Sequence, residues 1–578
     1  MMRTMVERHF VTVVGVQGTR QVHYRRAGSG PTVVVLHESP LSGRAYSGLV
    51  EELARNGFTG IALDNPGFGS SDPLALEQPE IADFTDGLVE TLDALGIEQA
   101  ALYGAHTGAC IALDTAIRHP ARVAAICLDG LPLFTEEERD RFLREYTPTF
   151  EPRWDGGHIL AAFTTRRDMK LFFPWFRKEE ATRLAIAVPP AEQLHEEALD
   201  LLRAKDTFHL GYKAAFRYRV EESLAGVGLP TVVTARSDEI LGAQLTRLGA
   251  VSPQVAVGLL PNDRGAWAKA ICRLFAERPA GSVAPSPPAT APVPGRLWRA
   301  YARTAGAGEL LVRRGGLTLA GGPAAAGASG GRPLVLLHPS PISGAMLVPL
   351  ATALARTRPV VVFDSPGYGD STPLPGEPAI ADFAQAIAAG IDSLELGEID
   401  LYGANTGACI AAEIALADPS RIHALVLDNP PIFDDELRRE LVERLCPPFV
   451  IRDDGLQLVA AWSFIRDHAM WFPPYRRDPE HVRPGPPPSL DELHLRTIEL
   501  LKGGASYGAG PRAAFSYPIA ERWPLLTSRT LVTAHSGMNA AYIRLDEAGA
   551  LVRGAEVRQR PRAPTAHAAL LAAFLDAR

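Results

Sequence analysis

The sequence predicts two tandem α/β domains, each built on a mostly parallel, doubly wound β-sheet. Three observations predict this fold: a set of motifs that occurs twice in the same order, short apolar segments that alternate with amphipathic ones, and a length of 578 residues. That length exceeds what one hydrophobic core usually supports, whereas half of it suits one large domain.

The duplication extends over most of each half. Segments 37–43, 64–69 and 104–108 return as 338–344, 364–369 and 403–407, at spacings between 299 and 301 residues. Solenoid repeats have periods of only tens of residues. The spacing therefore indicates two copies of a whole domain.

Buried parallel strands are predicted from short, continuously apolar segments, because strands covered on both faces need no polar alternation. These segments are 33–36 and 61–63 in the first copy, and 334–337 and 360–363 in the second. An amphipathic helix follows in each copy, with an apolar stripe formed by Phe84, Leu88, Leu92 and Leu95, or by Phe383, Ile387, Ile391 and Leu394. Leu102-Tyr103 and Leu401-Tyr402 then lead as strands into the third motif.

We expect the first domain to span residues 1–278 and the second to span 296–578. Residues 279–295 between them are rich in Pro and Ala, a composition that predicts an extended, flexible linker.

Composition excludes several classes of protein. The chain is 46% hydrophobic and 21% charged, with a net charge of −8. It has no apolar segment that could cross a bilayer, no secretory signal at its start and no basic cluster, so we expect a cytoplasmic protein without membrane or nucleic-acid partners. Five cysteines without close pairs argue against disulfides, and Cys110 and Cys409 are expected in the core. No metal or organic cofactor is predicted, because no clustered ligand set or phosphate-binding glycine loop is present.

Four features, taken in order along each half, resemble the α/β-hydrolase superfamily. They are a His-x-x-Pro loop after an early strand, Asp-x-Pro-Gly-x-Gly after the next, a G-x-x-x-G turn between strand and helix, and an acidic residue after the following strand. The resemblance covers nearly the whole of both halves. It implies a helical cap after that following strand, at about 131–228 in the first copy and 430–523 in the second.

The strand-to-helix turn lacks the family's nucleophile in both copies. In the family a serine at its centre is followed along the chain by an Asp or Glu and then by a His. Here the centre is His106 in the first copy and Asn405 in the second. Asp129 or Asp238 could supply the acid in the first copy, and Asp428 is the equivalent of Asp129 in the second.

The late histidine of the family is missing from the first copy, since segment 259–267 contains none. The second copy has His535-Ser536-Gly537 near its second acid position. Its His567 is expected inside the final helix, which makes it a poor substitute for the late base.

His106 can act near neutral pH as a general base oriented by Asp129 or Asp238, or as a nucleophile that attacks a carbonyl. The backbone N–H of Thr107 and the loop at Ser39 fall where the family builds its oxyanion hole, and Glu38 adds a second acid–base group. The alternative is that His and Asn occupy this turn only because both tolerate a positive φ, which would leave His106 with a structural or ligand-contacting role.

The cap carries a second repeated group, in which Arg167-Asp168 precedes an aromatic segment with Trp175 and Arg177. It predicts a pocket for a substrate with a flat apolar body and a carboxylate. The alternative is a cap helix that packs on the sheet with an internal Arg–Asp pair. His37 and His195 are further candidates for substrate contact, although family resemblance favours a bracing role for His37 beneath the oxyanion loop.

These observations predict an enzyme without a serine nucleophile. Its N-terminal copy would act on a small carbonyl compound by ester or carbon–carbon bond hydrolysis, or by a related lyase reaction. The alternative is a catalytically inactive binding or scaffolding protein. The second copy is predicted to be degenerate and to dock on the first as an intramolecular pseudo-dimer.

Overall fold

The computed structural model describes residues 5–249, 251–278, 281–306, 308–316, 332–535 and 544–577. The first four residues of the expected N-terminal region, Pro279 and Ala280 of the expected linker, and Ser536 and Gly537 lie outside these ranges. The chain forms two compact units. The N-terminal unit comprises Met1–Glu151, Gly157–Thr290 and Asp453–Gly455, and the C-terminal unit comprises Pro152–Gly156, Ala291–Arg452 and Leu456–Arg578.

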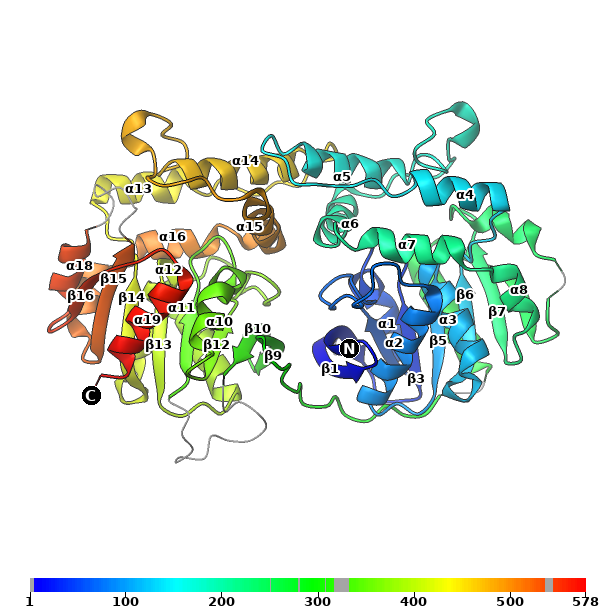
Figure 1. The fold of residues 1–578 in the computed structure, drawn as a ribbon, viewed down its shortest axis with the longest axis horizontal. Helices are drawn as coiled ribbons and strands as arrows, with labels where there is room; N and C mark the ends of the chain where they lie inside the picture. Colours follow the sequence, from blue (N-terminus) through cyan, green and yellow to red (C-terminus); the bar gives the residue numbers. More distant parts are fainter. Residues whose placement is uncertain are drawn as a thin grey trace. The chain divides into compact units, whose positions relative to one another are not determined.

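An eight-stranded sheet forms the centre of the N-terminal unit (Figure 1). β1 pairs antiparallel with β2, and β2 with β4, while the other neighbours pair in parallel. The predicted, mostly parallel sheet is thereby confirmed. In spatial order the strands are β1 (Glu7–Gly15), β2 (Gly18–Ala27), β4 (Thr59–Leu63), β3 (Thr32–Leu36), β5 (Ala100–Ala105), β6 (Val123–Asp129), β7 (Thr231–Arg236) and β8 (Val255–Leu260).

Helices cover both faces of this sheet. Successive side chains of a strand point to opposite faces, so a continuously apolar strand presents apolar side chains on both faces, and both must be covered. Val34 and Leu36 lie in one core with the predicted stripe of Phe84, Leu88 and Leu92. Val33 and Val35 lie in the core on the other face. The first core includes α2 (Ile81–Ala94) and α3 (Thr107–Arg118), and the second includes α1 (Ser47–Arg55) and α9 (Arg264–Ala276).

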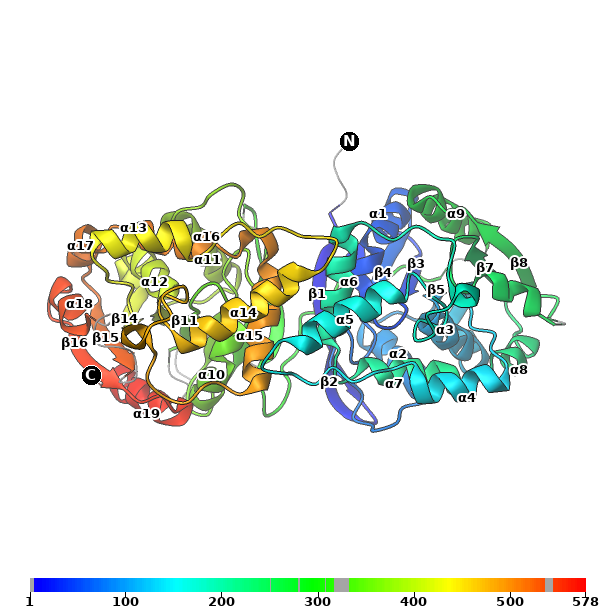
Figure 2. The same ribbon diagram turned by 90° about the horizontal axis from the view of Figure 1, so that it is seen from above.

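The helical cap lies between β6 and β7. Its helices are α4 (Glu136–Glu145), α5 (Gly157–Asp168), α6 (Ala191–Arg203), α7 (Phe208–Arg217) and α8 (Val220–Ala225). Helices α4 to α7 lie over one end of the sheet (Figure 1), and the view from above shows α5 and α6 crossing it (Figure 2). An aromatic cluster that includes Phe134, Phe142 and Tyr146 holds the cap together.

The C-terminal unit repeats this architecture around a second eight-stranded sheet. In spatial order its strands are β16 (Glu556–Arg560), β15 (Arg529–His535), β14 (Ile422–Asp428), β13 (Ile399–Ala404), β11 (Leu334–Leu337), β12 (Val360–Phe363), β10 (Gly308–Gly315) and β9 (Trp298–Thr304). Its helices are α10 (Val348–Leu354), α11 (Ile380–Ser393), α12 (Thr406–Ala417), α13 (Asp435–Arg444), α14 (Leu456–Met470), α15 (Leu490–Gly503), α16 (Ala509–Ser516), α17 (Ile519–Arg522), α18 (Leu545–Leu551) and α19 (Pro564–Leu575).

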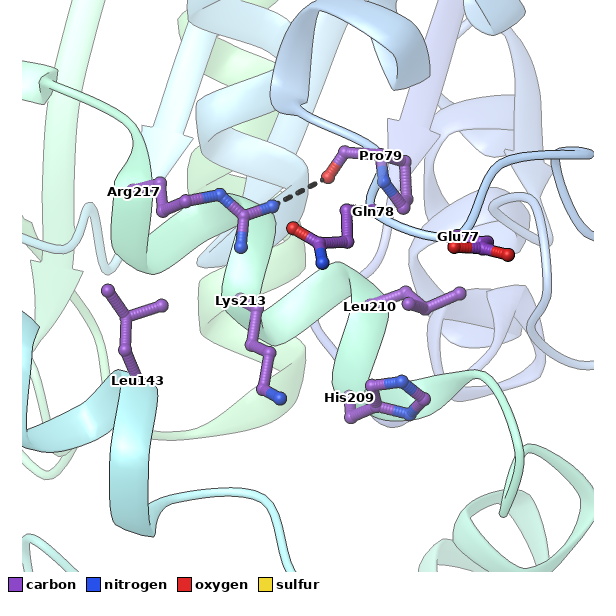
Figure 3. A pocket seen from close by; sticks show the side chains of 8 residues that line it. All are labelled: Glu77, Gln78, Pro79, Leu143, His209, Leu210, Lys213 and Arg217. Carbon is purple, nitrogen blue, oxygen red and sulfur yellow. Dashed lines mark hydrogen bonds between the residues drawn. The ribbon is translucent and has the colours of Figure 1, made fainter.

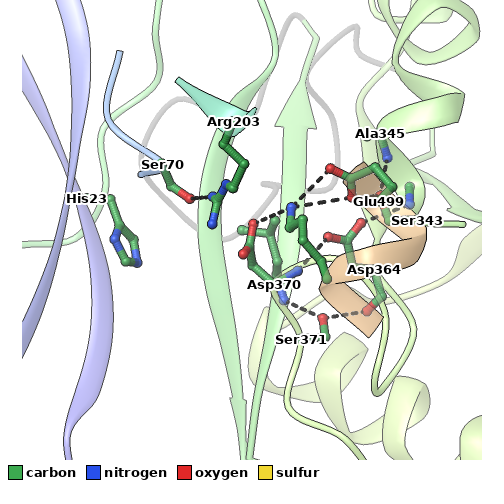
Figure 4. Close-up of polar contacts among 12 residues, drawn as sticks. His23, Ser70, Arg203, Ser343, Ala345, Asp364, Asp370, Ser371 and Glu499 are labelled. Atoms are coloured by element: carbon green, nitrogen blue, oxygen red, sulfur yellow. Dashed lines mark hydrogen bonds and ion pairs between the residues drawn. The ribbon is translucent and has the colours of Figure 1, made fainter. Parts of the chain in front are cut away.

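The Asp-x-Pro-Gly-x-Gly motif is a buried structural centre in both units. The Asp64 carboxylate accepts hydrogen bonds from His23 Nδ1 and from the backbone N–H of Gly43, each at 2.8 Å. In the C-terminal unit, Asp364 pairs with Arg313, and Ser371 Oγ donates to the Asp364 carbonyl at 2.7 Å (Figure 4). These bonds anchor the loop that follows β4 or β12.

The predicted linker is tethered at both ends. In the N-terminal unit, the backbone N–H of Thr32 donates to the Ser282 carbonyl at 3.0 Å, and Thr290 Oγ1 donates to the Phe10 carbonyl at 2.9 Å. Val293 is 5% exposed in the core of the C-terminal unit. The described part of the segment is therefore held at several points, whereas the composition predicted a flexible linker.

No helix among the described residues is long and apolar enough to span a bilayer. The five cysteines are free thiols, and Cys110 and Cys409 are fully buried in the cores, as predicted.

Candidate functional site

His106 lies at a sharp turn between β5 and α3. Its φ of 45° and ψ of −108° nearly equal the 49° and −111° of Asn405, which precedes α12 in the C-terminal unit. A Cβ on Gly104 would lie 2.3 Å from the Gly108 carbonyl oxygen, so only glycine permits this close crossing of strand and helix. The two units therefore hold different side chains on the same backbone.

The carboxylate next to His106 belongs to Glu239. His106 Nε2 lies 2.7 Å from Glu239 Oε1, and the Glu239 side chain is only 5% exposed. Burial alone would raise the pKa of Glu239, but the charge and hydrogen bond of His106 outweigh burial and hold this pKa below its usual range. An ionised carboxylate only accepts hydrogen bonds, so Nε2 carries the proton and Nδ1 is left as the basic nitrogen of the neutral ring.

The same pair governs the protonation of His106. Burial alone would lower the pKa of His106, but the charge and hydrogen bond of Glu239 outweigh burial and raise it above its usual range. The imidazolium form is therefore favoured at this site.

Gly130 makes room for the His106–Glu239 pair. It follows β6 with a φ of 63°, and a Cβ built on it would lie 2.7 Å from His106 Nε2 and 3.0 Å from Glu239 Oε2. A larger residue would have to displace one member of the pair. The corresponding residue of the C-terminal unit is Asn429, also at positive φ.

The two aspartates expected to orient His106 have other partners. Asp129 accepts hydrogen bonds from the Tyr103 hydroxyl at 2.6 Å and from Trp267 Nε1 at 3.0 Å, and burial raises its pKa. Asp238 lies 3.3 Å from Arg236 and is 44% exposed at its side chain. The expectation that either one orients His106 is corrected to Glu239, because Glu239 contacts the ring, whereas Asp238 pairs with Arg236 and is partly exposed.

Glu38 lies after β3 and lines the same cavity as His106 and Glu239. The hydroxyl of Tyr46 donates a short hydrogen bond to Glu38 Oε2. Burial opposes ionisation of Glu38, but the charge of His106 and the Tyr46 bond lower its pKa below the usual range. The charges of both Glu239 and Glu38 therefore act on His106.

These side chains line a cavity of about 120 Å³ beneath the cap. This volume is below the usual range of ligand pockets, so it suits only a small substrate. The wall combines charged and aromatic residues that include Glu38, Ser39, His106, Thr107, Tyr146, Arg166, Lys170, Glu197, Tyr212, Arg236, Asp238, Glu239 and Arg264.

A buried ionic cluster forms the cap side of this cavity. Arg166 Nε donates to Glu197 Oε2 at 2.7 Å, and Lys170 Nζ lies 3.5 Å from the same oxygen. Burial and the charge of Arg166 lower the pKa of Lys170. One carboxylate thus faces two cations, which leaves positive charge at the cap side of the cavity.

The cap residues predicted as substrate contacts lie elsewhere. Arg167 is exposed on the outer face of α5, and its buried neighbour Arg166 lines the cavity instead. Trp175 Nε1 donates to the Tyr146 carbonyl at 2.9 Å, and Arg177 pairs with Glu179 on the surface. His195 is buried in α6 away from the cavity lining, where burial lowers its pKa to about 4.

Three predicted residues of the loop and turn have clear positions. His37 is fully buried: Nδ1 contacts the Glu38 carbonyl at 2.9 Å, and Nε2 accepts from the Asn65 N–H at 2.8 Å. It braces the loop and is not among the residues that line the cavity, which argues against the predicted substrate contact. Thr107 begins α3 at the cavity, and Ser39 Oγ is a buried hydroxyl with no hydrogen-bond partner among the described residues.

The C-terminal unit has no counterpart of the His106–Glu239 pair among its described residues. Asn405 lines its cavity, and Asp428 accepts from the Tyr402 hydroxyl at 2.5 Å and from Arg560 Nε at 2.7 Å. Arg560 therefore neutralises the carboxylate that corresponds to Asp129.

A separate hollow of about 330 Å³ lies on the surface of the N-terminal unit (Figure 3). His209, Lys213 and Arg217 line it, and Arg217 Nη2 donates to the Pro79 carbonyl at 2.9 Å. None of the predicted site residues lines this hollow. Among the described residues, no group of three His, Cys, Asp or Glu side chains is placed to hold a metal ion.

Sequence reasoning missed Glu239, Arg166, Lys170 and Glu197. Glu239 follows Asp238 directly, and Arg166 precedes Arg167, so these two misses are each a shift of one residue. The signal that could have found Arg166 is the helical spacing of α5, which places it on the buried face with Ile159, Ala162 and Phe163.

Comparison with known proteins finds a family described as having the alpha/beta hydrolase fold, which matches residues 31–261 and 332–454. The bifunctional epoxide hydrolase 2 of Rattus norvegicus is 32% identical over 114 residues, which are 20% of this chain and 21% of that protein. The 2-hydroxy-6-oxo-6-phenylhexa-2,4-dienoate hydrolase of Comamonas testosteroni is 31% identical over 112 residues, 19% of this chain and 39% of that protein. The chain thus spans less than half the length of these curated relatives.

Among solved structures, epoxide hydrolase A from Mycobacterium thermoresistibile is 21% identical, with a TM-score of 0.38. That comparison covers 48% of this chain and 100% of the other.

Proposed function

Because the chain belongs to the α/β-hydrolase fold family, we propose that its N-terminal domain is an enzyme that hydrolyses a small carbonyl compound with His106 as the general base. Esters are the first substrate class, and carbon–carbon bond hydrolysis or a related lyase reaction would use the same base. The C-terminal domain takes no part in this chemistry.

The single observation that carries the proposal is the hydrogen bond between His106 and the buried Glu239, at the point where the family places its nucleophile. A histidine retained only for backbone tolerance needs no buried carboxylate on its ring. Holding two ionised or ionisable side chains in a largely buried site costs free energy, which favours a role for the pair.

In the proposed reaction, Nδ1 of neutral His106 removes a proton from a water molecule as that water attacks the carbonyl carbon. Glu239 holds the Nε2–H and stabilises the imidazolium that forms. The backbone N–H of Thr107 at the start of α3 stabilises the negative charge that develops on the carbonyl oxygen. His106 then returns the proton to the leaving alkoxide or carbanion.

Three neighbouring features can take part in substrate binding or proton transfer. Arg166 and Lys170 share one carboxylate, so the cap side of the cavity suits a substrate that carries a negative group. The free Ser39 hydroxyl offers a hydrogen bond to the substrate. Glu38, held by Tyr46, is an ionised carboxylate that can accept a proton.

We also propose that the two domains dock as a pseudo-dimer within one chain. A fused pair of like domains retains the isologous interface of a homodimer while one copy loses its chemistry. Residues 1–278 expressed alone should then self-associate, and residues 296–578 added in trans should restore a heterodimer. A monomeric and fully active N-terminal half would contradict this.

The function is tested by hydrolysis of 4-nitrophenyl esters of short acids. His106→Ala should reduce kcat/KM by about 10²- to 10⁴-fold, the usual contribution of a general base, while the matched change Asn405→Ala in the other domain leaves it unchanged. Equal losses from both changes, or activity that survives His106→Ala, would refute the proposal.

A further inference from the structure

The C-terminal unit holds a large cavity that the chemistry above does not use. Its volume is about 880 Å³, within the range that encloses an organic ligand. It lies between the turn at Asn405 and the cap helices α14 and α15, which supply Phe464 and Arg496. Since Asn405 can neither take a proton nor attack a carbonyl, this space is suited to binding rather than to hydrolysis.

Positive charge dominates the wall of this cavity. Its described lining contains five arginines and only three carboxylates, Asp428, Asp491 and Glu492. Asp428 is neutralised by Arg560, and Glu492 by Arg496 through an ion pair along one helix. The five arginines are Arg483, Arg496, Arg544, Arg560 and Arg562. Arg544 pairs with Asp434 and Glu547, which do not line the cavity. The lining itself therefore has fewer carboxylates than arginines.

Arg483 is the least compensated of these cations. Its Nε donates to the Trp471 carbonyl at 3.3 Å, and its Nη2 lies 3.4 Å from His468 Nε2. No carboxylate among the described residues lies within ion-pair distance of its guanidinium. Burial and the nearby charge of Arg496 lower the pKa of Arg483 to about 10. An anion between Arg483 and Arg496 would relieve this repulsion.

Neutral histidines extend the polar side of the cavity. Burial, with the charges of Arg560 and Arg562 nearby, lowers the pKa of His535 to about 4. Burial also lowers the pKa of His567 to about 4. The His567 side chain is 4% exposed, and its Nε2 has no hydrogen-bond partner among the described residues. A neutral imidazole whose ring nitrogen has no hydrogen-bond partner at a cavity wall can form a hydrogen bond with a hydroxyl or acid group of a ligand.

The N-terminal unit differs at the corresponding positions. There Glu197 pairs with both Arg166 and Lys170, and the cavity lining has four cations and four carboxylates. At the constant spacing of 299 residues, Glu197 corresponds to Arg496, and Arg166 and Lys170 correspond to Ile465 and Ala469. The carboxylate of this wall is thus replaced by an arginine in the C-terminal unit, and the two cations that face it are replaced by apolar residues.

The rest of the C-terminal cavity is apolar. Phe433 and Phe472 stack at 5.8 Å between ring centroids, and Phe464 and Phe515 also line the space. A bare inorganic ion would leave this aromatic wall unused. The lining favours a ligand with an anionic end and a flat or bulky apolar body.

We propose that the C-terminal domain is a binding site for a small organic acid, in which Arg483 and Arg496 grip the anionic group and the phenylalanines enclose the apolar body. Carboxylate and phosphate both fit the guanidinium groups. This site is separate from the proposed hydrolytic site, so a failure of either proposal leaves the other unaffected.

Isothermal titration calorimetry on the full chain tests the proposal with three probes that share a phenyl ring, of which phenylsuccinate and phenylsuccinamide also have matched shapes. Phenylsuccinate carries two carboxylates, phenyl phosphate carries a phosphate, and phenylsuccinamide is neutral. At least one acid should bind with one site per chain, and the neutral amide should not. The preference between the two acids identifies the anionic group.

Arg483→Gln and Arg496→Gln should each weaken binding of that acid by about ten-fold or more, because each removes a charge-assisted hydrogen bond. The control Arg477→Gln lies in the same cap, pairs with Asp467, is 63% exposed and should leave binding unchanged. Thermal melting of each variant shows whether the fold is intact. Binding of neither acid at millimolar concentration, or equal affinity in wild type and both folded variants, would overturn the proposal.

Discussion

Replacing Glu239 by Gln keeps the size and one acceptor oxygen of the side chain but removes its charge from His106 Nε2. The pair lies at 2.7 Å with the carboxylate 5% exposed, so it is a charge-assisted hydrogen bond in a poorly solvated site. Such a bond contributes about 1.5–3 kcal/mol. Since about 1.4 kcal/mol corresponds to a factor of ten in rate, kcat/KM should fall by roughly 10- to 150-fold.

The pH dependence of kcat/KM in the same variant gives a second, independent measure of the effect of Glu239 on His106. A general base works in its neutral form, so kcat/KM of the wild type should rise with pH through the raised pKa of His106. Without the Glu239 charge, burial dominates and lowers that pKa. The rising limb should therefore move to lower pH in Glu239→Gln, while the plateau rate falls because the base is weaker.

The assay is the pH profile of kcat/KM for hydrolysis of 4-nitrophenyl acetate by wild type and variant. Asp238→Asn is the matched control, because Asp238 is the adjacent carboxylate but pairs with Arg236 at 3.3 Å. It should show the wild-type profile. A Glu239→Gln profile that coincides with the wild type, or an equal shift in Asp238→Asn, would refute the role assigned to the pair.

Three further outcomes are expected. Gly130→Ala should lower kcat by about ten-fold or more, because its Cβ would lie 2.7 Å from His106 Nε2. Gly228→Ala is the control, because its Cβ would meet no atom within 4 Å, and it should keep full activity. Equal kcat values for the two variants would contradict the packing argument. A fluorophosphonate probe should label neither turn, and mass spectrometry that finds stoichiometric labelling of Ser39 with loss of activity would identify a different nucleophile. Asp64→Asn should lower the free energy of unfolding measured in urea by about 3–5 kcal/mol, because it removes the negative charge that pairs with the buried His23 and the nearby Arg25. The control Asp155→Asn, at an exposed position, should change this free energy little. Comparable losses from both changes would show that the Asp64 centre is not structural.

Sequence patterns predicted the fold in detail because each pattern has one physical cause. Val33 to Leu36 are continuously apolar since helices cover both faces of β3, and Phe84, Leu88 and Leu92 repeat at helical spacing since one face of α2 is buried. The turn at His106 was also predictable, because its two glycines are required by the close crossing of strand and helix. These patterns reflect local constraints on single elements, which do not depend on how distant segments of the chain are arranged.

The site was harder to predict because its partners are distant in sequence and selected by side-chain direction. Glu239 reaches His106 only through the shape of the turn after β7, and sequence alone does not distinguish it from Asp238 beside it. In α5, a rotation of about 100° per residue separates the buried Arg166 from the exposed Arg167. The charge reversal between Glu197 and Arg496 is visible in the sequence but has meaning only once both are known to face cavities.

The most direct test of the central claim is kcat/KM of His106→Asn. Asn405 already occupies the same turn at φ 49°, so this change tests the chemistry of the imidazole without straining the backbone. We predict a loss of about 10²-fold or more in kcat/KM for 4-nitrophenyl acetate, with an unchanged melting temperature. Activity within about two-fold of wild type, from a protein that melts normally, would contradict the claim that His106 is the base.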